Sequence, residues 1–192
     1  PVNLEEEYTE QCLARIIDPT SKVLELGARY GVVSCAINSM LSEKYYHVAV
    51  EPDPTVIHAL EKNKQLNNAK FNIFHGVVSR SDNLYVHQDG YATYTSTTPS
   101  DNKVTSATLE ELEELYGFKF NMLFADCEGF LEQFFKENPE FIKRLKMIIY
   151  EKDGKECNYK YIENTLESLN FENVYNAKLR DGYITHCVWV QK

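Results

Sequence analysis

Short apolar runs alternate with amphipathic segments along most of the chain. The runs are rich in β-branched and aromatic residues and are bounded by polar clusters, which predicts buried strands. These predicted strands are Lys22–Leu26, Tyr46–Val50, Phe71–Val78 with an interruption near Gly76, Phe120–Ala125 and Lys146–Glu151. Segments with the apolar spacing of a helix lie around and between them. These predicted helices are Leu4–Ile17, Val32–Leu41, a helix with Asp53 as N-cap and Pro54 at its first position, Leu109–Leu115, one starting over Gly129–Phe135, and Tyr159–Leu169.

The C-terminal part of the pattern differs from the rest. Two apolar runs, Phe171–Ala177 and Tyr183–Val190, flank Asp181-Gly182, which is a strong signal for an antiparallel hairpin. Strands that alternate with helices and end in a hairpin predict an α/β fold with a doubly wound, mostly parallel sheet, one antiparallel strand and helices on both faces. The segment Ser79–Ser106 is polar, with one hairpin-like Asp89-Gly90, and predicts an irregular insertion or lid. Without repeats, residues 1–192 are expected to form a single domain.

Composition narrows the choice of partner. The chain has 29 Asp and Glu against 20 Lys and Arg, a net charge of −9, and no local basic patch, so nucleic acid and anionic membranes are not expected to bind. A small molecule or a neutral group is the expected partner. Five scattered cysteines without a C-x-x-C pair indicate reduced thiols, and no run is long enough to span a bilayer. We expect a cytoplasmic protein that is a monomer or a homodimer.

The stretch LELGARYGVV, residues 24–33, is typical of a strand that is followed by a ligand-binding loop and a helix. Gly27 ends the first predicted strand and Gly31 opens the next helix, so backbone amides can approach a ligand there. Glu51, followed by Pro52, ends the second predicted strand, where a carboxylate can accept hydrogen bonds from both hydroxyls of a ribose. Ligands bind at this edge of open α/β sheets, so the sequence predicts a nucleoside site.

The loop also discriminates between ligands. A dinucleotide fingerprint needs a glycine where Arg29 stands between Ala28 and Tyr30, because the pyrophosphate requires space. S-adenosylmethionine has no phosphate and tolerates a side chain there, and Glu25 adds negative charge beside a cationic ligand. The methyl donor is therefore favoured.

Residues near the end of the third predicted strand complete the expected cofactor site. His75, Gly76 and Val77 lie there. His75 could contact the adenine or act as a base. A histidine at such a place is more often a loop residue whose ring nitrogens are simply hydrogen-bonded.

Three carboxylates follow the fourth and fifth predicted strands. Asp126, which also borders the cofactor site, and Glu128 end the fourth, and Glu151 closes the fifth. Adjacent strand ends should bring the three together beside the donor, where one of them could remove a proton from an acceptor. They could instead hold Mg²⁺ or Ca²⁺, but the sequence offers no further ligand pair, and no metal site is predicted. Glu128 fits equally well as a carboxylate in the first turn of a helix.

Five segments together resemble a known family. VLELGARYGVVS, VAVEPDP, SATLEELEEL, FADCEGF and IIYEKD follow the order and spacing of the FkbM-type S-adenosylmethionine-dependent methyltransferases, from about Val23 to the final hairpin. The resemblance implies a seven-stranded sheet and methyl transfer to a hydroxyl oxygen of a sugar, a lipid or another small molecule. It departs from the family at Arg29, where asparagine is common.

Two alternatives stay open. Arg29 is compatible with a non-catalytic nucleoside-binding module. A nicotinamide-dependent oxidoreductase is disfavoured by the same residue and by the lack of a Tyr-x-x-x-Lys pair.

Overall fold

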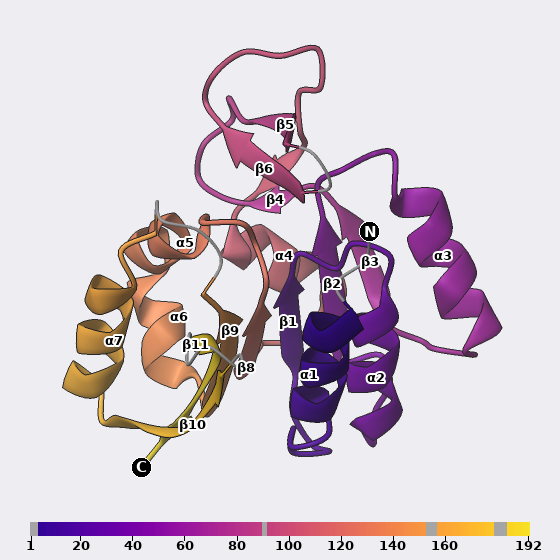
Figure 1. Ribbon diagram of the computed structural model, residues 1–192. Helices are drawn as coiled ribbons and strands as arrows, with labels where there is room; N and C mark the ends of the chain where they lie inside the picture. The colour runs from indigo at the N-terminus through magenta and orange to yellow at the C-terminus, as the bar shows by residue number, and fades with distance from the viewer. Residues whose placement is uncertain (1–3, 90–91, 153–156, 179–183) are drawn as a thin grey trace.

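A seven-stranded sheet forms the centre of the molecule (Figure 1). The structure, a computed structural model, describes residues 4–89, 92–152, 157–178 and 184–192. The sheet has the order β10-β11-β9-β8-β1-β2-β3. Its strands are β1 (Val23–Leu26), β2 (His47–Glu51), β3 (Asn72–His75), β8 (Met122–Ala125), β9 (Met147–Glu151), β10 (Phe171–Lys178) and β11 (Ile184–Gln191).

The pairing directions confirm the predicted sheet. The strands β3, β2, β1, β8 and β9 pair in parallel, and β11 is antiparallel to both β9 and β10. The sheet is therefore doubly wound and mostly parallel, with a C-terminal antiparallel pair. The predicted turn at Asp181-Gly182 lies outside the described residues.

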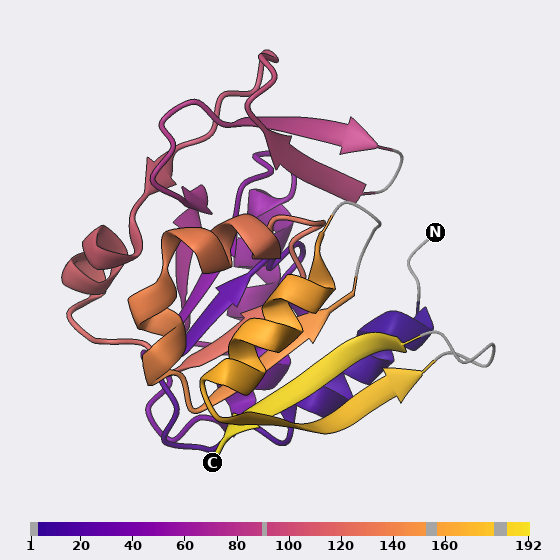
Figure 2. The same ribbon diagram turned by 90° about the vertical axis from the view of Figure 1, so that its left-hand side faces the viewer.

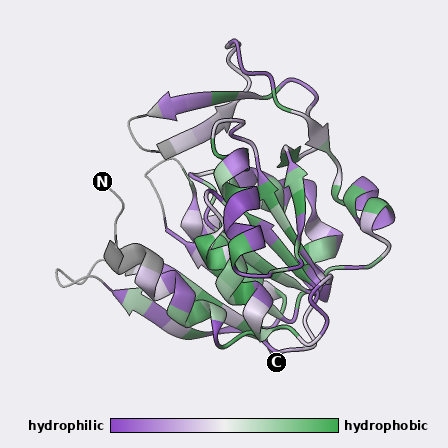
Figure 3. Cartoon of the chain, turned by 90° about the vertical axis from the view of Figure 1, so that its right-hand side faces the viewer, coloured by the Kyte–Doolittle hydropathy of each residue, from purple (hydrophilic) through white to green (hydrophobic). Residues whose placement is uncertain are grey.

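Helices cover both faces of the sheet (Figure 2). They are α1 (Leu4–Ala14), α2 (Val32–Met40), α3 (Ile57–Leu66), α4 (Leu109–Tyr116), α5 (Leu131–Glu137), α6 (Pro139–Arg144) and α7 (Tyr159–Ser168). One core lies under α1 and α2 and a larger one under α4 to α7. Every residue of β1, β2 and β8 is buried, which explains their apolar character, and Figure 3 shows the hydrophobic residues gathered on these inner strands.

Two helices differ from the prediction. The helix expected at Pro54 begins at Ile57, so the assignment of Asp53 as its N-cap is wrong. The Asp53 carboxylate instead accepts from the backbone N–H and the hydroxyl of Thr55, at 2.8 and 2.7 Å, and this local turn precedes the helix. Helix α6 is short and starts with a proline, and the apolar spacing did not predict it.

The segment between β3 and α4 is more regular than predicted. It contains an antiparallel hairpin of β5 (Tyr85–Asp89) and β6 (Ala92–Ser96), and β7 (Ser106–Ala107) pairs with β4 (Val77–Val78). A small apolar core of Val77, Leu84, Val86 and Val104 anchors this hairpin. The prediction of an irregular insertion is therefore wrong over these strands. The hairpin lies above the carboxyl ends of the parallel strands, and we call it the hairpin roof (Figure 1).

Neither a membrane-spanning helix nor a disulfide is found in the part of the chain that the structure describes. None of its helices has both the length and the apolar character needed to cross a bilayer. All five cysteines lie in described segments, and none of them is joined to another.

Candidate functional site

A pocket of about 210 Å³ opens at the carboxyl ends of β1, β2 and β8, beneath the hairpin roof. Most of the residues predicted for the site line it. These are Glu25, Gly27, Ala28, Arg29, Tyr30, Glu51, Pro52, Gly76, Val77, Asp126 and Glu128. The roof contributes Thr93, Tyr94 and Thr95 of β6. The pocket thus joins segments that are far apart in the chain.

The turn after β1 requires glycine at its first position. Gly27 has a φ of +85°, and a Cβ atom there would lie 1.5 Å from the backbone oxygen of Asp126. The Gly27 N–H donates to the Val50 carbonyl at 3.0 Å, so the turn sits between the ends of β2 and β8. A side chain would push these strand ends apart. Gly27 therefore fixes the floor of the pocket.

The second glycine of the loop has a structural role. Gly31 has a φ of +76°, and a Cβ atom there would lie 2.4 Å from Leu60 Cδ1 of α3. It opens α2 as predicted, but it is not among the described residues that line the pocket. The positive φ, together with the packing of α2 against α3, is sufficient to explain this glycine.

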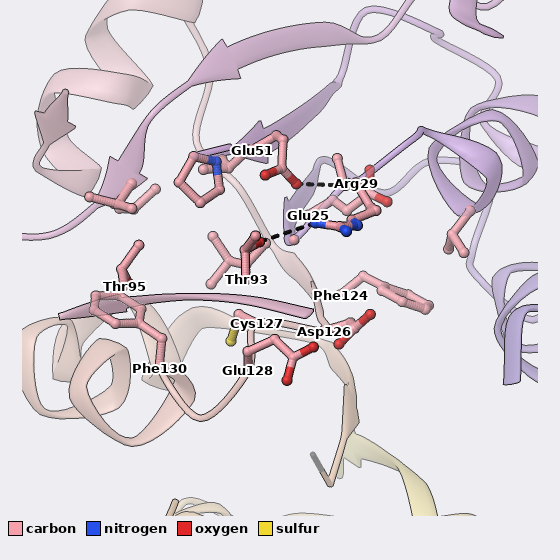
Figure 4. A pocket seen from close by; sticks show the side chains of 18 of the residues that line it. Glu25, Arg29, Glu51, Thr93, Thr95, Phe124, Asp126, Cys127, Glu128 and Phe130 are labelled. Carbon is pink, nitrogen blue, oxygen red and sulfur yellow. Dashed lines mark hydrogen bonds between the residues drawn. The ribbon is translucent and has the colours of Figure 1, made fainter. Parts of the chain in front are cut away.

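Glu51 projects from the end of β2 into the wall of the pocket (Figure 4). Its side chain is buried, with 2% exposed, and its two oxygens accept backbone N–H groups of Arg29 and Asp53, each at 2.7 Å. Burial raises the pKa of this carboxyl to about 7. The two backbone hydrogen bonds and the Arg29 charge lower this pKa, and the nearby Asp53 charge raises it. Glu51 is therefore a carboxyl that changes its charge near neutral pH.

Replacing Glu51 by glutamine is expected to remove a pH dependence from the stability of the fold. The carboxyl has a pKa of 4.5 in its ordinary environment and about 7 in the folded protein. Between these values the unfolded chain releases the proton and the folded protein keeps it. The free energy of unfolding therefore falls as the pH rises, by up to about 3 kcal/mol, and the loss is complete above the folded pKa.

Chemical denaturation across this pH range measures the effect. The wild-type free energy of unfolding should fall relative to that of Glu51→Gln as the pH rises. Glu61→Gln is the matched control, because Glu61 is exposed on α3, and it should follow the wild type. Parallel curves for the wild type and Glu51→Gln would contradict the assignment.

Arg29 links the loop to the roof. Its φ is +47°, and its backbone N–H donates to the Glu51 carboxylate. Its guanidinium contacts Asp53 Oδ2 at 3.4 Å and Thr93 Oγ1 at 3.2 Å. Figure 4 shows the side chain spanning from the loop toward β6. The sequence indicated only that Arg29 would crowd a pyrophosphate; its contact with the roof depends on the hairpin.

Asp126 and Glu128 lie across the pocket from Glu51 (Figure 4). The chain turns after β8 through Glu128 and Gly129, which have φ angles of +48° and +86°. Phe130 N–H donates to the Cys127 carbonyl at 3.1 Å and closes this turn. Asp126 is half-buried and Glu128 is exposed at the rim. Two carboxylates therefore face the pocket from the end of β8.

Two further residues predicted for the site, Glu151 and His75, are not among the described residues that line the pocket. Glu151 ends β9, which β8 separates from the glycine loop, and it pairs in register with His186 of β11. The expected convergence of three carboxylates therefore holds for Asp126 and Glu128 but not for Glu151. His75 is exposed at the end of the edge strand β3. Its neighbours Gly76 and Val77 reach the pocket because the chain turns inward after β3.

Two of the carboxylates that line the pocket are each paired with a buried histidine. Glu25 of β1 lies 2.9 Å from His47 Nε2, measured from Oε2. Glu10 of α1 lies 3.4 Å from His186 Nε2, measured from Oε1. Glu10 was missed by sequence reasoning, because nothing in a covering helix shows which residue will meet a strand at the other end of the chain.

The charged residues that line the pocket are mostly acidic. Among the described residues they are one arginine, Arg29, and five carboxylates: Glu10, Glu25, Glu51, Asp126 and Glu128. Such a wall favours a cationic ligand over one rich in phosphate. Within the described ranges, no three histidine, cysteine or acidic side chains come together as a metal site would require.

Comparisons with known proteins identify the fold. No protein-family model matches the sequence, and no curated protein matches it. The FkbM-type resemblance therefore stays a prediction.

Three solved structures illustrate the similarity. A ribosomal protein L11 methylase from Lactobacillus delbrueckii subsp. bulgaricus has a TM-score of 0.60 at 13% identity, covering 100% of this chain and 81% of that one. An O-methyltransferase from Bacillus cereus in complex with SAH has a TM-score of 0.58 at 14% identity, covering 100% and 83%. A putative tRNA (m1A22) methyltransferase from Streptococcus pneumoniae, in complex with S-adenosyl-L-methionine, has a TM-score of 0.60 at 12% identity, covering 96% and 72%. At such identities the likeness shows the fold alone, and that fold is the Rossmann-like fold of these methyltransferases.

Proposed function

We propose that the chain is an S-adenosylmethionine-dependent methyltransferase that acts on a hydroxyl oxygen of a small molecule, a sugar or a lipid. The observation that carries this proposal is the position of Glu51. Its carboxyl lies beside the glycine loop at the wall of an acidic pocket. Each Glu51 oxygen accepts one backbone N–H and keeps a further acceptor position, so the two can receive the two ribose hydroxyls of the donor.

The charge of the pocket supports the same cofactor. S-adenosylmethionine carries a sulfonium and an ammonium group against one carboxylate, so its net charge is positive. A dinucleotide would bring a pyrophosphate beside Asp126, Glu128 and Glu25, where like charges repel. The similar structures with bound SAH or S-adenosyl-L-methionine support this choice.

The reaction needs a proton acceptor beside the donor. S-adenosylmethionine supplies an electrophilic methyl group when it is bound. As the acceptor oxygen bonds to the methyl carbon, the carbon–sulfur bond breaks and the hydroxyl proton must leave. We assign this proton to Asp126 or Glu128, because both reach the pocket from the end of β8. The acceptor would lie beneath β6, between these carboxylates and Thr93 or Thr95.

A non-catalytic nucleoside-binding module is the second candidate. Arg29 favours it, because its guanidinium contacts the roof at Thr93 and is also held by Asp53, which follows β2. A module of this kind would bind the donor tightly without turnover on any acceptor. A labelled-donor screen with hydroxylated sugars and lipids separates the two candidates.

Donor binding is the first test of the proposal. Isothermal titration of the wild type should give binding of S-adenosylmethionine and S-adenosylhomocysteine, and none of the nicotinamide cofactors. Glu51→Gln should weaken the affinity for both of these ligands by about thirtyfold. This corresponds to about 2 kcal/mol from lost charge-assisted hydrogen bonds. Glu61→Gln, exposed on α3, should bind like the wild type. Equal affinities in the wild type and Glu51→Gln would remove the ribose assignment.

A further inference from the structure

One edge of the central sheet is formed by a long strand that has a neighbour on one side only. Strand β10 stands at the end of the strand order, and among the described residues it pairs with β11 alone. Figure 2 shows it along the outer margin of the molecule. Edge strands commonly avoid further pairing through short length, proline or charged side chains. β10 is eight residues long, and it has neither a proline nor a charged residue between Glu172 and Lys178.

The middle of β10 exposes two consecutive apolar side chains. Val174 is 53% exposed and Tyr175 is 51% exposed. The pairing with β11 shifts between Asn173 and Tyr175, so Val174 has no partner residue on β11. Bulges of this kind also serve to protect edges from pairing. The charge pattern of the strand therefore has to identify what could cover it.

The charges of β10 are complementary to those of a second copy of the same strand. In a contact about a twofold axis, residue i of one copy meets residue j of the other, and j meets i. Glu172 and Lys178 are each three positions from Tyr175. With antiparallel strands and the axis at Tyr175, Glu172 of each copy therefore lies opposite Lys178 of the other. Opposite charges that face each other across two strands stabilise the pair.

Both charged side chains are available for this contact. Glu172 forms an ion pair with Lys192 at 3.2 Å, and both partners are exposed, so this pair contributes little and does not bury the carboxylate. Lys178 is exposed and forms no ion pair with any residue in the described ranges. No described residue that lines the pocket belongs to β10, so the contact uses no pocket residue.

We propose that the chain forms a homodimer in which the β10 strands of two copies pair antiparallel about a twofold axis at Tyr175. The two sheets then join edge to edge into one continuous sheet. Val174 and Tyr175 are covered, and Glu172 pairs with Lys178 of the second copy at both ends of the contact. An interface of one strand from each copy is small, so we expect a Kd in the micromolar range. The proposal does not depend on the proposed function.

Charge reversal tests the partner and the register together. Glu172→Lys and Lys178→Glu each place like charges opposite one another at both ends of the strand pair. Each variant should weaken the dimer at least about tenfold in analytical ultracentrifugation. An equimolar mixture of the two variants should dimerise like the wild type, because the mixed pair restores opposite charges at both ends. Glu61→Lys and Lys62→Glu are the matched controls, since both residues are exposed on α3, and they should behave like the wild type.

A cysteine at the axis provides a second measurement. Directly opposite residues of an antiparallel pair have Cα atoms about 4.5 to 5.5 Å apart, which suits a disulfide. Tyr175→Cys should therefore form a covalent dimer under mild oxidation, and the wild type, which has five free cysteines, should not.

Three results would overturn the proposal. The first is a wild type that stays monomeric up to about 500 μM, which would mean that the bulge protects the edge. The second is a dimer that neither charge reversal weakens, because such a dimer uses another surface. The third is a mixture of the two reversed variants that stays monomeric although the wild type dimerises. None of these results bears on donor binding, which titration measures separately.

Discussion

Replacing Gly27 by alanine is expected to abolish donor binding. The new Cβ atom would lie 1.5 Å from the backbone oxygen of Asp126, so the ends of β1 and β8 must separate. We expect a loss of donor affinity of at least about a hundredfold, because displacing the pocket floor by about an ångström misplaces every contact to the ligand. The free energy of unfolding should fall by about 3 kcal/mol, from strain at positive φ and overpacking. Far-ultraviolet circular dichroism should stay close to that of the wild type, because the elements themselves persist.

Gly117→Ala is the matched control for this experiment. Gly117 has a φ of +76° at the end of α4, close to the φ of Gly27, but a Cβ atom there meets nothing within 4 Å. This variant should lose about 1 kcal/mol of stability from backbone strain and bind the donor normally. Titration and thermal denaturation of both variants separate steric collision from backbone strain. Wild-type affinity in Gly27→Ala would remove the loop from the donor site.

The carboxylates after β8 are expected to govern the rate. Asp126→Asn and Glu128→Gln keep the size of each side chain and remove its basicity. The variant that lacks the proton acceptor should transfer methyl groups a hundredfold to ten-thousandfold more slowly, which is the usual contribution of a general base. Its donor affinity should change little. Rates come from labelled donor with an acceptor identified in the screen.

An exposed glutamate on α4 provides the control for these rates. Glu114→Gln should react like the wild type, because Glu114 is exposed and is not among the described residues of the pocket. If both Asp126→Asn and Glu128→Gln keep the wild-type rate, positioning alone drives transfer and the carboxylates are structural.

Much of the fold could be predicted because it depends on local pattern. Apolar runs bounded by polar clusters mark buried strands, and parallel strands end at the same edge of a sheet. Gly27 and Glu51 were therefore placed together before any contact was known, and the structure joins them through the Arg29 backbone. The hairpin roof was harder to predict, because its residues are polar and alternate only over five positions in each strand.

The parts of the site that were missed depend on tertiary contacts. Glu10 and His186 are 176 residues apart, and no local pattern relates them. The raised pKa of Glu51 comes first from burial, which no sequence motif encodes. Glu151 was misplaced for a related reason. Its position at a strand end was correct, but β9 is one strand too far from the glycine loop.

The hairpin roof has a consequence for the timing of ligand exchange. Its base is packed on a small apolar core, whereas the Arg29 guanidinium contacts β6 through the Thr93 hydroxyl at 3.2 Å. The Arg29 side chain is 26% exposed, and a polar contact in such a place contributes at most about 1 kcal/mol. Contacts of this strength break and re-form on the nanosecond-to-microsecond timescale of loop motions. We therefore expect β6 to move relative to the glycine loop while the base of the roof stays in place, so that the residence time of a ligand is set by its own contacts in the pocket.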